Sequence, residues 1–81
     1  MTKKTGLVPV TVRAVLQRIN RKLAPESQVV RKTRGSRAIQ DLGEYYLLDW
    51  NRNVVLDSRV DVERLGRKLK LVGDWESVVA D

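Results

Sequence analysis

Residues 11–25 read TVRAVLQRINRKLAP, and this stretch decides the fold. Apolar side chains recur in it at the spacing of one face of an α-helix, namely at Val12, Val15, Leu16, Ile19 and Leu23. Thr11 occupies the position of an N-cap. Pro25 ends the helix, because the residue before a proline disfavours the helical backbone. The pattern predicts an amphipathic helix over residues 12–24 whose apolar face packs into a core.

The opposite face of this helix is basic. At about 100° per residue, its cations fall on the two flanks of the apolar stripe and opposite to it: Arg13, Arg18, Arg21 and Lys22. The helix holds no acidic residue that would pair with them one turn away. Two interpretations stay open, a surface that contacts a polyanion and an ordinary solvated helix face.

Charge is distributed unevenly along the chain. Residues 1–40 contain ten Lys or Arg and one acid, Glu26, for a net +9. Residues 41–81 contain six basic and nine acidic side chains, for a net −3. A local excess of positive charge attracts polyanions, which makes nucleic acid the first partner to consider and an acidic protein surface the second.

Three strand patterns follow the helix. Residues 28–33 and 45–50 are rich in β-branched, aromatic and apolar residues, and a loop is expected between them. Residues 51–53 contain two asparagines that tolerate left-handed backbone angles, so a tight hairpin into a third strand at 54–56 is predicted. Alternating Val and Leu neighbours favour core packing over base stacking for the aromatic residues Tyr45, Tyr46 and Trp50.

A second helix is expected after Asp61, which is placed as its N-cap. Val60 and Leu65 are spaced as a hydrophobic staple across that cap. Gly66 is expected to weaken the helix slightly, because glycine is a poor helix former.

The end of the chain completes the predicted topology. Gly73 and Asp74 indicate a stop and a new cap, so a short helical turn that carries Trp75 over the core is expected. The predicted fold class is α+β with the order α-β-β-β-α, a three-stranded antiparallel sheet with helices packed on one face, and this C-terminal turn.

The length of the chain predicts a single domain. Residues 1–8 are expected to form a flexible basic N-terminus and residues 9–81 one α+β domain. A core this small leaves stability marginal, so a homodimer is compatible with the sequence. There is no cysteine and no pattern of a signal peptide or membrane span, which favours a cytoplasmic protein.

The segment at the end of the second strand pattern is the sharpest candidate site. It combines cations, hydroxyls and Gly35, a mixture suited to phosphate groups, in Arg31, Lys32, Thr33, Arg34, Ser36 and Arg37. Arginine grips a phosphate through two parallel N–H bonds, and glycine lets the backbone approach closely. The alternative is a solvated loop whose charges maintain solubility and protect a strand end.

Catalysis has little support in the composition. The chain contains no His and no Cys, and its serines lie in no nucleophile motif. We therefore expect a protein that is not an enzyme, with no catalytic residues, no metal site and no cofactor.

The predicted element order resembles that of double-stranded-RNA-binding domains, which recognise helix shape, phosphates and 2′-hydroxyls. The likeness is one of topology. The loop between the second and third strands has no His, and the basic run of residues 64–68 departs from the lysine-rich helix start of that family. No binding residue is carried over from it.

A second resemblance covers most of the chain. Residues 13–23, then Tyr45-Tyr46 with Asp49, Arg52-Asn53 and Val60-Asp61, resemble small uncharacterised proteins borne on bacterial plasmids and phages. This resemblance implies a bacterial mobile-element origin and supplies no activity or site.

Two functional hypotheses follow. The first is a nucleic-acid-binding protein, of DNA or RNA, that contacts the phosphate backbone through the basic helix face and the basic segment of residues 31–37. The second is a protein-interaction module, such as a mobile-element inhibitor that docks on a host defence complex. The acidic second half of the chain suits the second hypothesis, since it would repel a duplex laid across the whole molecule.

Overall fold

A computed structural model of the chain describes residues 7–80. In chain order its elements are β1 (Val8–Thr11), α1 (Val12–Leu23), the 3₁₀ turn η1 (Ala24–Glu26), β2 (Gln28–Lys32), α2 (Ser36–Leu42), β3 (Tyr45–Asp49), β4 (Val54–Asp57), α3 (Val62–Lys68) and β5 (Glu76–Val79). The fold is α+β, as the sequence predicts.

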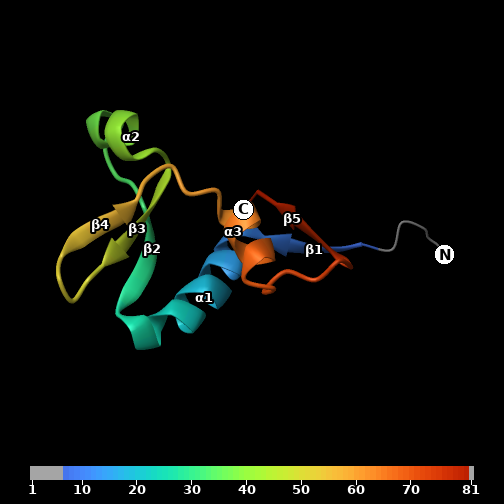
Figure 1. The fold of residues 1–81 in the computed structure, drawn as a ribbon. Helices are drawn as coiled ribbons and strands as arrows, with labels where there is room; N and C mark the ends of the chain where they lie inside the picture. Colours follow the sequence, from blue (N-terminus) through green and yellow to red (C-terminus); the bar gives the residue numbers. More distant parts are fainter. Residues whose placement is uncertain (1–6, 81) are drawn as a thin grey trace.

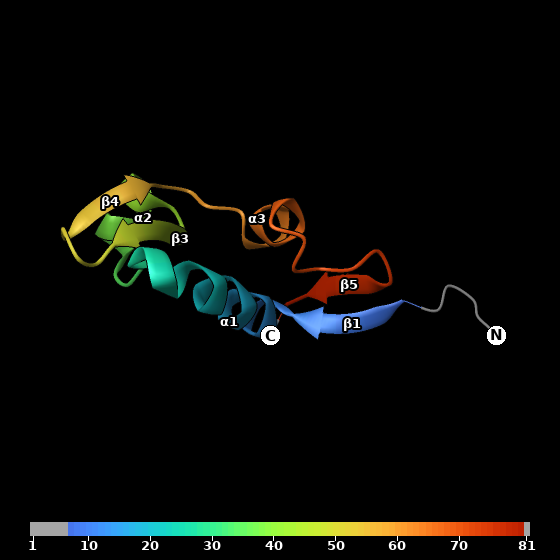
Figure 2. The ribbon, with the colours of Figure 1, turned by 60° about the horizontal axis from the view of Figure 1, so that its bottom comes forward.

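Two small sheets lie at opposite ends of α1 (Figures 1 and 2). The sheet at its C-terminal end is antiparallel, with the order β2-β3-β4 and Val30 opposite Leu47. The sheet at its N-terminal end pairs β1 with β5 in parallel, with Val10 opposite Val78. Because α1 follows β1 directly and is joined to β2 by η1, it connects both sheets and carries the core between them.

The core is aliphatic and gathers along the buried face of α1. Val15 and Ile19 of α1 are fully buried, as is Val30 of β2. Val62 of α3 and Val72 complete the cluster from the other side. The apolar stripe that the sequence predicts is therefore the face of α1 that packs.

Asn20 fixes α1 against the outer edge of β2. Its side-chain Nδ2 donates to the Val30 carbonyl at 3.1 Å, and the Val30 N–H donates to its Oδ1 at 2.7 Å. These two backbone groups of Val30 point away from β3, so the Asn20 amide satisfies groups that a neighbouring strand would otherwise bind.

The N-caps predicted at Thr11 and Asp61 and the predicted hairpin are confirmed. The Thr11 hydroxyl accepts a hydrogen bond from the Ala14 N–H at 3.1 Å, and the Asp61 carboxylate accepts one from the Arg64 N–H at 3.1 Å. In the turn between β3 and β4, Asn53 has a φ of +59°, the left-handed angle that asparagine tolerates.

Three parts of the predicted topology are wrong. The C-terminal segment is not a helical turn but the strand β5, and Trp75 is 65% exposed instead of covering the core. The expected loop between the first two strand patterns contains the helix α2. A further strand, β1, precedes α1 and includes Val8, a residue of the predicted flexible terminus. The expectation of flexibility for residues 1–6 lies outside the described residues.

Each difference has a physical reason. β1 and β5 are each four residues long and pair with a partner more than sixty residues away, so neither shows a local signal. In α2, Ala38, Ile39 and Leu42 do recur at helical spacing before Gly43, but the seven-residue pattern is shorter than the window on which helical periodicity is usually recognised.

Gly66 has a packing role in addition to its expected effect on helix propensity. It is buried where α3 meets α1, and a Cβ atom there would lie 2.8 Å from Val15 Cγ1 and 3.0 Å from Val72 Cγ2. Valine side chains are stiff, so neither methyl group moves aside easily. The absence of a side chain at this position lets the two helices approach closely.

We predict that Gly66→Ala destabilises the protein by about 1–3 kcal/mol through overpacking. Helix propensity alone predicts the opposite sign, a gain of about 1 kcal/mol. Urea unfolding followed by circular dichroism measures the difference. Gln17→Ala, at an exposed position of α1, is the matched control and is expected to leave stability nearly unchanged. A Gly66→Ala variant more stable than the wild type would contradict the packing described here.

Candidate nucleic-acid interface

The basic segment of residues 31–37 lies at the end of β2 and in the first turn of α2. The Thr33 N–H donates to the Glu44 carbonyl at 2.8 Å, which extends the pairing of β2 with the chain before β3 by one residue pair. Gly35 then turns the chain into α2 with a φ of +88°, an angle that L side chains rarely adopt. Nothing lies within 4 Å of the position of its absent Cβ, so the backbone there is open to approach.

The four cations of this segment, Arg31, Lys32, Arg34 and Arg37, are exposed. Within residues 7–80 their side chains form no hydrogen bond or ion pair with another residue. Ser36 is exposed beside them. Their positive charge is therefore available to a ligand.

Four carboxylates of the second half have partners outside the basic segment. Asp49 accepts hydrogen bonds from the backbone of the β3–β4 turn, Asp57 one from Ser58, and Asp61 caps α3. Glu63 forms an ion pair with Arg67 one turn along α3, at 3.2 Å. These four carboxylates therefore do not bind the basic segment, whereas Asp41 and Glu44 are exposed and are the nearest acids to it in the chain, with Glu44 paired to Thr33 through the backbone.

A groove of about 660 Å³ opens between the basic segment and α2. Its lining consists of Arg31, Lys32, Thr33, Arg34, Ala38, Leu42 and Tyr46. Thr33 is 6% exposed, and its hydroxyl has no hydrogen-bond partner among residues 7–80. The structure thus adds an aromatic ring and two apolar side chains to the predicted cations, and it shows that the predicted Thr33 hydroxyl is buried.

Three groove residues have surroundings that the sequence did not predict. The first is Tyr46, which was expected in the core but lies half-buried in the groove. Its neighbour Tyr45, which does not line the groove, packs against the core as expected. Ala38 and Leu42 lie on α2, where a loop was expected. Their helical spacing is the signal that identifies them as one wall.

The cations of α1 lie apart from this groove. Arg21 and Lys22 are exposed at the end of α1, next to the start of β2, whereas the basic segment follows the end of β2 (Figure 1). Arg31 and Tyr46 lie on the face of the sheet opposite to Val30 and Leu47, which pack into the core with α1. Arg13 is exposed in the first turn of α1. The basic residues therefore occupy two or more separate places on the surface.

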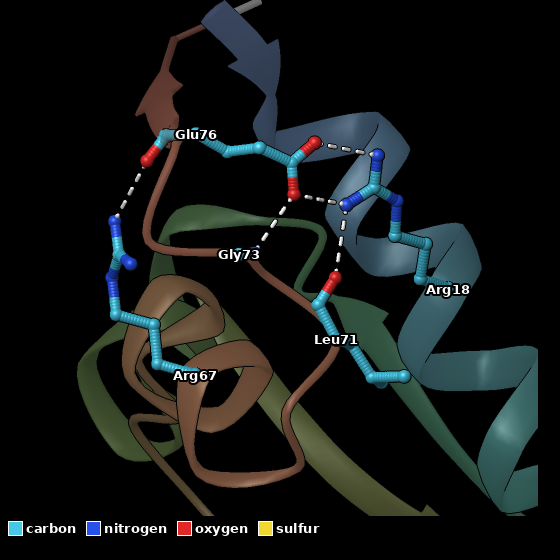
Figure 3. Close-up of polar contacts among 5 residues, drawn as sticks. All are labelled: Arg18, Arg67, Leu71, Gly73 and Glu76. Carbon is cyan, nitrogen blue, oxygen red and sulfur yellow. Dashed lines mark hydrogen bonds and ion pairs between the residues drawn. The ribbon is translucent and has the colours of Figure 1, made fainter. Parts of the chain in front are cut away.

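Arg18 has a structural partner. Its guanidinium donates to both carboxylate oxygens of Glu76, at 2.8 and 3.0 Å, and to the Leu71 carbonyl at 2.9 Å (Figure 3). Glu76 also accepts from the Gly73 N–H at 2.9 Å, and Arg67 donates to the Glu76 carbonyl at 3.2 Å. Among the four cations of α1, Arg18 is thus neutralised by the second half of the chain, and we leave it out of the candidate interface.

This contact shifts the pKa values of both Arg18 and Glu76. The Arg18 guanidinium, helped by the Gly73 N–H, lowers the pKa of the Glu76 carboxyl from 4.5 to about 2. Desolvation of the carboxylate opposes this shift but does not overcome it. The hydrogen bond to Glu76 raises the pKa of Arg18 in turn.

Comparison of the chain with protein-family models, with curated proteins and with solved structures gives no match. Each helix within residues 7–80 is too short or too polar to cross a membrane. The same residues contain no group of three or more carboxylate side chains placed to hold a metal ion together.

We predict that the Arg18–Glu76 contact makes stability depend on acid. Because the pKa of Glu76 is lower in the folded than in the unfolded chain, its contribution is complete above pH 4.5 and disappears as the pH falls towards 2. Glu76→Gln is expected to be less stable at neutral pH and to lose less stability than the wild type across this window. Thermal unfolding at a series of pH values measures both effects.

Asp74→Asn provides the control for that experiment. It removes an exposed carboxylate two residues away and leaves the Arg18–Glu76 contact in place. Its pH profile should follow that of the wild type. Parallel profiles for Glu76→Gln and the wild type would show that the pair does not stabilise the fold.

Proposed function

We propose that this protein is a small, non-enzymatic nucleic-acid-binding protein that contacts the phosphate backbone of DNA or RNA. The observation that carries the proposal is the basic segment of Arg31, Lys32, Arg34 and Arg37. These cations are exposed, close together in the chain and without a partner among residues 7–80. The paired N–H donors of arginine and the exposed backbone at Gly35 suit the acceptor oxygens of a phosphate.

The second basic site supports an extended ligand rather than a small anion. Arg21 and Lys22 lie in the last turn of α1, which leads through η1 into the start of β2. A duplex carries one charge for about each 1.7 Å of its axis, so one nucleic acid can reach both sites at once. A bacterial plasmid or phage origin and a cytoplasmic location belong to the same proposal.

One observation favours a protein partner instead. All four residues of β4 are exposed, and its outer edge has no neighbouring strand within the described part of the chain. Val54, Val55 and Leu56 are the apolar members of this strand. Edges of this kind pair with other chains, so a homodimer or a protein-interaction module, such as an inhibitor of a host defence complex, is the second candidate function.

We predict that Arg31→Gln, Arg34→Gln and Arg37→Gln together weaken nucleic-acid binding nearly uniformly across sequences, because phosphate contacts carry no base information. On duplex DNA the slope of log affinity against log salt should become shallower by about 0.9 for each phosphate that the variant no longer neutralises. Fluorescence anisotropy with a labelled duplex, in a salt series, measures both quantities.

The matched control removes the same amount of charge from another surface. Arg64→Gln, Lys68→Gln and Lys70→Gln lower the net charge equally but lie on and just after α3. This control should retain most of the affinity and the wild-type salt slope. Equal weakening in the two triple variants would mean that net charge alone drives binding. Failure of the wild type to bind any nucleic acid at low salt would favour the protein partner.

A further inference from the structure

The groove beside the basic segment has the features of a site for an unpaired base. Its volume of about 660 Å³ lies within the range of about 300–1,000 Å³ typical of pockets that enclose small ligands. One wall is α2, through Ala38 and Leu42, and the other is the end of β2 with Tyr46 of β3.

The register of the sheet places a cation beside the aromatic ring. Arg31 lies directly opposite Tyr46 in the β2–β3 pair, where Cβ atoms are about 4.5–5.5 Å apart. Alternation along the strands puts both residues on the face opposite to Val30 and Leu47, which pack into the core. Tyr46 and Arg31 are therefore presented together on a face that α1 does not cover.

Thr33 supplies an independent indication of a ligand. Its side chain lines the same groove and is more than nine-tenths buried, yet its hydroxyl has no hydrogen-bond partner among residues 7–80. Buried hydroxyls are nearly always paired, so the Thr33 hydroxyl needs a hydrogen-bond partner that residues 7–80 do not supply, either a water molecule or a polar group of the ligand.

The geometry points to single-stranded nucleic acid as the ligand of this groove, with one base stacked on Tyr46 and its flanking phosphates held by Arg31 and Arg34. This inference rests on the proposed function and narrows its substrate class. A base within a duplex is stacked on both faces and cannot enter a recess, whereas an unpaired base offers its face to an aromatic ring. Between residues 31 and 46 the four cations exceed the two acids, Asp41 and Glu44, so the mouth of the groove stays positive.

The test compares four labelled probes on the full-length wild-type protein by fluorescence anisotropy at low salt. They are a twelve-nucleotide oligothymidine, an abasic strand of equal phosphate count, and a duplex of the same length, with oligouridine as the RNA arm. The base-bearing single strands should bind more tightly than the abasic strand and the duplex. Equal binding of the base-bearing and abasic strands, or tighter binding of the duplex, would overturn the inference.

Variants of Tyr46 test the same inference at the ring. Tyr46→Leu should weaken binding of the base-bearing strands by about 5- to 150-fold, the range expected when one base no longer stacks on a ring, and leave the abasic strand unaffected. Tyr46→Phe keeps the ring and should restore wild-type affinity. Trp75→Leu removes an exposed aromatic residue before β5 and is the matched control.

The outcomes separate the two proposals. If Tyr46→Leu binds the base-bearing strands as tightly as the wild type does, the stacking site is wrong while phosphate binding stands. If no probe binds the wild type, the proposed function fails and the inference fails with it. Should Tyr46→Leu not fold, the comparison of base-bearing and abasic strands on the wild-type protein decides the question alone.

Discussion

The fork of hydrogen bonds between Arg18 and Glu76 holds the two halves of this molecule together. Arg18 projects from α1, and Glu76 begins β5, the last strand of the chain. The same two side chains also bind the Leu71 carbonyl and the Gly73 N–H, so they fix the segment that leads from α3 into β5. β5 in turn pairs with β1 next to α1. The small parallel sheet is thus anchored to the helix that carries the core.

The same contact explains how charge is distributed on the folded protein. Of the carboxylates in the second half, Glu76 is the one whose described contacts reach a cation of α1, whereas Asp49, Asp61 and Glu63 serve turns and α3 within their own half. Negative charge consequently stabilises local structure and does not neutralise the basic segment. Residues 31–37 therefore keep in the folded protein the excess of positive charge that the sequence shows. Arg18 no longer contributes to this excess, because it is paired with Glu76.

Sequence reasoning predicts those elements whose signals are local. The stripe of Val15 and Ile19 with Thr11 as the cap, and the asparagine-rich hairpin, are patterns that one segment carries by itself. The pairing of β1 with β5 joins the two ends of the described chain, and no local pattern reports it. The groove escapes prediction for a related reason, because Tyr46 acquires its surroundings only when α2 lies beside the sheet. Gly66 shows the same limit, since its role depends on Val15 of another helix.

The two edges of the three-stranded sheet are not equivalent, because the Asn20 amide occupies the outer backbone groups of β2 at Val30 whereas β4 has no such cover within the described residues. A further strand can therefore pair with the β4 edge of the sheet, whereas Val30 on the β2 edge is already occupied. Two molecules joined through β4 would form one continuous sheet whose ends are both a β2 strand already blocked by its own helix. Within the three-stranded sheet, such an arrangement closes at two copies, because each end is then a β2 edge that Asn20 covers at Val30.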